Sequence, residues 1–145
     1  MTDARSEENK ELIRRYFEAI DSNPDDESIL DEFIAEDFVD HNPNPGCTRD
    51  LEGMKKAYRI FAEASPGTHA IEQMVAEGDI VVSRVTARGT HTGDLFGMPP
   101  TEKEFSTTGI AIHRIRDGKI VEHWNEIDMV GVMQQIGPLA GANPG

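Results

Sequence analysis

The sequence of 145 residues is poor in cysteine, tryptophan and basic side chains. Its single cysteine, Cys47, excludes a disulfide within the chain and any metal site made of cysteines alone. No apolar run approaches the roughly 18 residues that a membrane-spanning helix needs. Lys and Arg number 14 against 27 Asp and Glu, for a formal charge of −13, so nucleic acids and anionic membranes are disfavoured as partners.

Several short motifs of enzyme classes are also missing. There is no glycine pattern that cradles phosphate, no nucleophile elbow and no H-E-x-x-H pair of metal ligands. We therefore expect no cofactor and no metal, although four of the five histidines, His41, His91, His113 and His123, could in principle build a metal site with an aspartate. The N-terminus is charged and lacks the apolar region of a signal peptide, which predicts a cytoplasmic protein.

What is present indicates one domain of the α+β class, with helices first and antiparallel strands later. We expect the single domain to span 1–145, with a core of about 9–137 and a tail, 138–145, prone to disorder. Apolar spacing predicts helices over 6–21, about 27–35, Leu51 to about 64, and 129–136. Strands are expected over 69–76, 80–91 and from about 103 onward, whereas 36–46 is expected to be irregular, with Phe38 and Val39 inward.

Asp117-Gly118, between two apolar runs, is the strongest hairpin signal in the sequence. A two-residue turn would pair Arg116 with Lys119, and a three-residue loop with a glycine bulge would pair Ile115 with Lys119. The two alternatives place different side chains on each face of the sheet.

Three segments together resemble the SnoaL-like polyketide cyclases of the nuclear transport factor 2-like (ketosteroid-isomerase-like) superfamily. They are Gly89-Thr-His-Thr-Gly-Asp-Leu-Phe-Gly-Met-Pro-Pro-Thr101, Arg116-Asp-Gly-Lys-Ile-Val-Glu-His-Trp124, and Asp128 with Gln134-Gln-Ile-Gly137. The resemblance implies a cone-shaped, curved antiparallel sheet, with N-terminal helices enclosing a central cavity. It also implies a cofactor-free intramolecular aldol ring closure that uses an aspartate as acid and base, with a histidine nearby.

The residues of that resemblance depart from the family at its catalytic pair. Aligned on Asp-Gly-Lys-Ile, the cyclases' aspartate falls on Asn125 and their histidine on Ala111. An amide takes no proton at neutral pH, and the histidine partner is also missing, so we expect no measurable aldol cyclisation of anthracycline-type precursors by this protein. The catalytic candidates are therefore His123, His113 or His41, or Asp128, as the base, with Asn125 donating to a developing oxyanion.

The family's active-site pair must share one face, and only the three-residue loop achieves this in a regular hairpin. We accordingly predict that Ala111, His113, Val121, His123 and Asn125 point inward. The outer positions are then Ile110, Ile112, Glu122, Trp124 and Glu126, unless a local bulge turns Trp124 toward the cavity. An outer face this apolar predicts a homodimer through the sheet.

The remaining candidates are substrate-binding residues: His41, His91, Phe96, Met98, Ala111 and Trp124. His41 follows the second helix, where a cavity mouth is expected, and it can equally stabilise a loop. His91 ends a strand beside a Gly/Pro loop, whose Phe96 and Met98 are able to form a lid or a packed connection. Asp128 precedes the last helix and suits a cap.

Three functions follow from the sequence. The first is a cofactor-independent acid/base enzyme, related to the ester cyclases, that cyclises, isomerises or hydrolyses a small apolar or polyketide-like substrate. The second is a non-catalytic binding protein that holds a small molecule in the same cavity. The third is an assembly module whose sheet face matters more than its cavity.

Overall fold

The computed structural model describes residues 3–137 and has one curved sheet of five strands in the order β1-β5-β4-β3-β2. The strands are β1 (Ile34–Asp40), β2 (Gly67–Glu77), β3 (Ile80–Thr90), β4 (Glu104–Arg116) and β5 (Lys119–Ile127). The helices are α1 (Ala4–Ser22), the 3₁₀ turn η1 (Glu27–Ile29), α2 (Leu30–Phe33), α3 (Leu51–Ala64) and α4 (Met129–Ile136). The α+β class and the curved sheet are confirmed, and the tail 138–145 lies outside the described residues.

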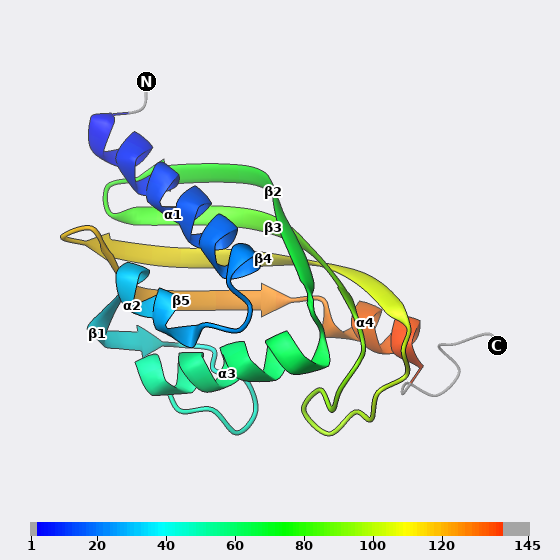
Figure 1. Ribbon diagram of the computed structural model, residues 1–145. Helices are drawn as coiled ribbons and strands as arrows, with labels where there is room; N and C mark the ends of the chain where they lie inside the picture. The colour runs from blue at the N-terminus through cyan, green and yellow to red at the C-terminus, as the bar shows by residue number, and fades with distance from the viewer. Residues whose placement is uncertain (1–2, 138–145) are drawn as a thin grey trace.

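The long helix α1 crosses one face of the sheet over β2 and β3, and α2 and α3 lie beside β1 (Figure 1). We call the face that α1 covers the inner face and the opposite one the outer face. Asp3 caps α1 through a hydrogen bond from Ser6 N, and Leu12, Ile13 and Tyr16 at helical spacing are buried. The core thus forms between α1 and the strands. No helix within 3–137 is long and apolar enough to cross a membrane.

Residues 36–40 of the segment expected to be irregular belong to the edge strand β1, which pairs in parallel with β5, whereas 41–46 are irregular as expected. The predicted second helix accordingly ends at Phe33, and Ile34 begins the strand. Phe38 is buried as expected, but Val39 is 39% exposed because neighbouring strand residues point to opposite faces. The sheet is therefore antiparallel except for this one pair.

The hairpin turn has two residues, not the three that we predicted, since Arg116 pairs with Lys119. Asp117 and Gly118 both have positive φ, 52° and 76°, as a type I′ turn requires. A bulge then shifts the register between Arg114–Glu122 and Ile115–Ile120, which leaves Val121 as the extra residue. Beyond the bulge, Ala111 faces Asn125 directly. The shared face was predicted correctly, but the bulge produces it.

Gly53 lies at the start of α3, where its amide donates to Asp50 Oδ1 at 2.9 Å. A Cβ at this position would lie 1.8 Å from the carbonyl oxygen of Thr48. We expect Gly53→Ala to lower the free energy of unfolding by about 2–3 kcal/mol, because the backbone must shift to relieve the clash. Urea unfolding measures this, with Glu63→Ala on the same helix as the control. Equal stability of Gly53→Ala and the wild type would contradict the placement of the capping loop.

Candidate functional site

Two histidines form the centre of the inner face. His113 on β4 and His123 on β5 are direct cross-strand partners. Their rings stack with centroids 5.0 Å apart and an angle of 26°. The ring of Tyr16 on α1 contacts His113 edge-on at 5.9 Å. Helix α1 therefore covers the histidine pair from the side opposite the sheet.

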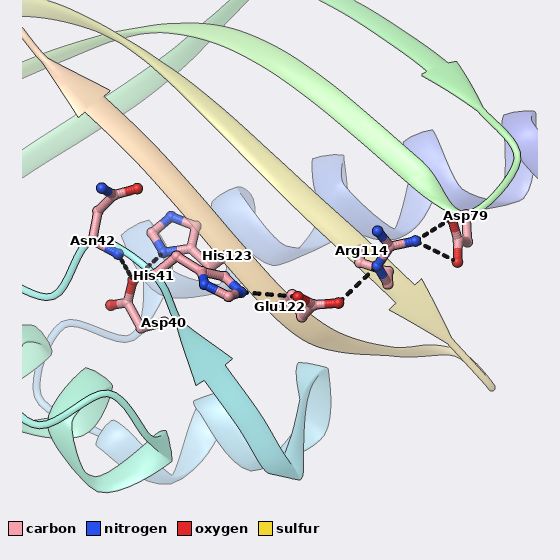
Figure 2. Close-up of polar contacts among 7 residues, drawn as sticks. All are labelled: Asp40, His41, Asn42, Asp79, Arg114, Glu122 and His123. Atoms are coloured by element: carbon pink, nitrogen blue, oxygen red, sulfur yellow. Dashed lines mark hydrogen bonds and ion pairs between the residues drawn. The ribbon is translucent and has the colours of Figure 1, made fainter.

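His123 is held by a buried carboxylate. Asp40 ends β1 opposite His123, and its Oδ1 lies 3.2 Å from His123 Nδ1 (Figure 2). The same oxygen accepts a hydrogen bond from the amide of Asn42 at 3.0 Å, and Asp40 is only 3% exposed. A carboxylate accepts, so His123 Nδ1 donates its proton and Nε2 keeps a free lone pair. This Asp40–His123 pair has the arrangement of an oriented general base.

Burial lowers the pKa of His113 well below its ordinary value of 6.5, and the charge of a protonated His123 would lower it further. His113 is therefore neutral at physiological pH. Burial also raises the pKa of the Tyr16 hydroxyl, and the nearby carboxylate of Asp40 adds to that shift. Both groups are therefore neutral beside the Asp40–His123 pair.

Ala111 and Asn125 form the next pair along the same two strands. They share the inner face with His113 and His123, as predicted, because residues two apart on a strand point the same way. The positions that carry the cyclases' catalytic pair therefore lie one step along the hairpin from the two histidines. His123, which Asp40 contacts, lies two residues before Asn125 on β5.

His41 and Trp124 lie on the outer face. The regular hairpin predicted this place for Trp124, whereas the place at the cavity mouth expected for His41 is wrong. Their rings stack with centroids 4.5 Å apart and an angle of 6°. His41 Nε2 lies 2.8 Å from Glu122, which also accepts from Arg114 Nε at 2.7 Å, and Arg114 reaches Asp79 (Figure 2). Strand alternation after the bulge sends Glu122 and Trp124 outward, and His41 follows them.

The three remaining candidates lie in the connection between β3 and β4. His91, expected beside the ligand, is 0% exposed: its Nε2 donates to Met98 O at 3.1 Å and its Nδ1 accepts from Thr101 Oγ1 at 3.0 Å. Both ring nitrogens thus hold the loop together, and the binding role predicted for His91 is not supported. Phe96 packs edge-on against Phe61 of α3 at 5.5 Å, so a lid role for Phe96 and Met98 stays a prediction.

Asp128 is the N-cap of α4, where its Oδ1 accepts from Gly131 N at 2.9 Å. The capping role that we expected is confirmed. The side chain is exposed and engaged at the helix start, so the structure does not bring it to the Asp40–His123 pair.

Asp40, Tyr16 and Ser83 were not among the candidates from sequence. The signal available for Asp40 was the apolar pair Phe38-Val39 directly before it, which is typical of a strand that ends in a carboxylate. We interpreted this segment as a loop. Tyr16 and Ser83 match the apolar periodicity of their elements and carry no separate signal. Among residues 3–137 no group of three or more His, Cys, Asp or Glu side chains is placed to hold a metal ion.

This chain is similar to known proteins over most of its length. Residues 10–136 match the family model of the SnoaL-like polyketide cyclases. The aklanonic acid methyl ester cyclase DauD of Streptomyces sp. (strain C5) is 33% identical over 132 residues, which cover 88% of this chain and 80% of the relative. The nogalonic acid methyl ester cyclase of Streptomyces nogalater is 31% identical over 117 residues, covering 74% and 83%.

Solved structures show the same fold. TsrD from Streptomyces laurentii superposes with a TM-score of 0.81 at 30% identity, covering 96% of this chain and all 100% of that one. IdmH from Streptomyces antibioticus superposes with a TM-score of 0.76 at 36% identity, covering 89% and 98%. Since the family model, the relatives and the structures all extend over most of its length, this chain belongs to the SnoaL-like polyketide cyclase family.

Proposed function

We propose that this protein is a cofactor-independent cyclase that closes a ring in a polyketide-like ester, with His123 as the general base. The observation that carries the proposal is the 3.2 Å contact between Asp40 Oδ1 and His123 Nδ1 on the inner face. His123 takes the place of the aspartate that the family carries at Asn125, so this proposal departs from our expectation from the sequence that the protein carries out no aldol cyclisation. The similarity to aklanonic and nogalonic acid methyl ester cyclases supports the substrate class.

In this proposal His123 Nε2 removes a proton from the carbon next to a substrate carbonyl. The carbanion adds to a second carbonyl carbon of the same molecule, which forms the new carbon–carbon bond. The resulting alkoxide then takes the proton back from the His123 imidazolium. Asp40 stabilises that imidazolium and keeps Nδ1 protonated, so the ring presents the same nitrogen throughout. Every atom of the substrate remains in the product.

The test is the rate of ring closure of aklanonic acid methyl ester, followed by chromatography, with protein that has been dialysed against a strong chelator. We expect turnover above the uncatalysed rate, and addition of zinc should not increase it. Binding of the ester without turnover would instead support the alternative, a non-catalytic binding protein of the same fold.

We also propose that the protein acts in the cytoplasm, because its sequence has one cysteine and an acidic composition.

We further propose that the protein is a homodimer through the outer face. A groove of about 420 Å³ there has an apolar lining that includes Ile80, Ile110, Ile112 and Trp124. Ile110 is 47% exposed and lies between Arg84 on β3 and Glu126 on β5 in one row across the sheet. A two-fold axis that runs over Ile110 parallel to the strands would set Arg84 of each copy against Glu126 of the other. The outer face would then be complementary to itself.

Arg84→Glu is accordingly expected to convert the dimer to a monomer at micromolar concentration, because it places like charges opposite each other. The double variant Arg84→Glu with Glu126→Arg restores the opposite charges and should restore the dimer. Sedimentation velocity measures both, with Arg116→Glu at the hairpin end as the control. A wild-type protein that sediments as a monomer would refute this assembly.

A further inference from the structure

Two polar atoms on the inner face have no hydrogen-bond partner among residues 3–137: Ser83 Oγ and His113 Nδ1. Ser83 is 0% exposed and His113 is 2% exposed. Buried polar side chains are almost always hydrogen-bonded, since an unpaired one loses its contacts with water and gains none in return. Such a pair in the interior therefore indicates polar groups that a bound molecule satisfies.

The two atoms belong to neighbouring strands and to one face of the sheet. Ser83 lies opposite Ala111, and His113 lies opposite Val81, so Ser83 and His113 are diagonal neighbours. Diagonal neighbours lie roughly 7–8 Å apart, with their Cβ atoms somewhat closer, so two short polar side chains at these positions can reach one acceptor atom. A neutral imidazole has one N–H and a serine has one O–H, so each side chain can donate to the same acceptor.

We propose that Ser83 O–H and His113 Nδ1–H hold the carbonyl oxygen of the substrate, a ketone or an ester, beside the general base. This inference rests on the proposed function. The His113 ring stacks 5.0 Å from His123, so a carbonyl bound at the donor pair brings its neighbouring C–H group toward His123. As that proton leaves, negative charge develops on the carbonyl oxygen, and the two donors stabilise it.

A groove on the surface borders side chains that lie next to the donor pair. It has a volume of about 530 Å³ and lies between α1 and β2, with Phe17 and Met74 in its lining. Met74 is the cross-strand partner of Ser83, and the Phe17 ring lies 6.3 Å from that of His113. The same two side chains therefore border both the groove and the donors. Methionine is unbranched and adapts its shape easily, so it suits an entrance for an aromatic ligand.

The test compares 9-fluorenone with fluorene, which has the same rings without the carbonyl group. Calorimetric titration of the wild type should show tighter binding of fluorenone, and infrared spectra should show its carbonyl stretch at lower frequency than in water. Ser83→Ala should weaken fluorenone binding by about five- to tenfold and leave fluorene binding unchanged. His113→Phe should act in the same way, and both variants should reverse part of the infrared shift.

Two comparisons separate this role from a purely structural one. Ser83→Ala removes an unpaired buried hydroxyl, so it should melt no lower than the wild type although it binds the ketone less well. Ser106→Ala, an exposed serine on β4, is the control and should change nothing. His123→Gln should still bind fluorenone with the shifted carbonyl stretch, so the donor pair is tested even if His123 is not the base. Equal affinity of the wild type for fluorenone and fluorene would overturn the proposal.

Discussion

His123→Gln is expected to lower kcat for ring closure by about 10²- to 10⁴-fold, the usual contribution of a positioned general base. Glutamine is similar in length, and its amide can still donate to Asp40, so the fold and the buried carboxylate should be preserved. It has no lone pair basic enough to take a proton from carbon. The loss should therefore appear in kcat, with little change in KM.

His41→Gln is the matched control for this experiment. His41 also contacts a carboxylate, that of Glu122 at 2.8 Å, but it lies on the outer face. Its kcat should stay within about twofold of the wild type, as for a residue outside the reaction. If His123→Gln kept most of its activity while Asn125→Ala lost it, the base would be elsewhere and the proposed role of His123 would be wrong.

Acidification below pH 6.5 is expected to destabilise the fold through His113. Burial lowers the pKa of His113 well below 6.5 in the folded protein, whereas the unfolded chain keeps the ordinary value. Between these two pKa values the unfolded state binds one more proton than the folded state. The free energy of unfolding should thus fall by about 1.4 kcal/mol for each pH unit below 6.5, until the folded-state pKa is reached. The full contribution is present above pH 6.5.

Urea unfolding at several pH values between 7.5 and 5 measures this slope. His113→Phe keeps a ring against Tyr16 and Phe17 and removes the titrating group, so its slope should be smaller by one proton. Four carboxylates have a lowered pKa: Asp3, Asp50, Asp79 and Glu122. They lose their stabilising contribution only at lower pH, below their ordinary pKa values of 3.8 for Asp and 4.5 for Glu. An identical slope in the wild type and in His113→Phe would show that His113 is not buried as a neutral ring.

Local sequence determined the elements whose signals lie within a few residues. The apolar spacing of 6–21 and the cap Asp128 predicted helices that the structure contains, because caps and helical faces depend on neighbours three or four residues away. Asp117-Gly118 predicted the hairpin for the same reason, since only residues that tolerate positive φ fit that turn.

Tertiary structure alone decided the site. The strand β1 forms because β5, more than eighty residues later, supplies its hydrogen bonds. No local sequence pattern predicts a parallel edge strand. That pairing brings Asp40 to His123 across 83 positions of sequence. The bulge at Val121 determined which hairpin residues face inward, and the Asp117-Gly118 turn does not predict it. The same bulge placed His41 and Trp124 outside, because a shift of one residue moves every following side chain to the other face.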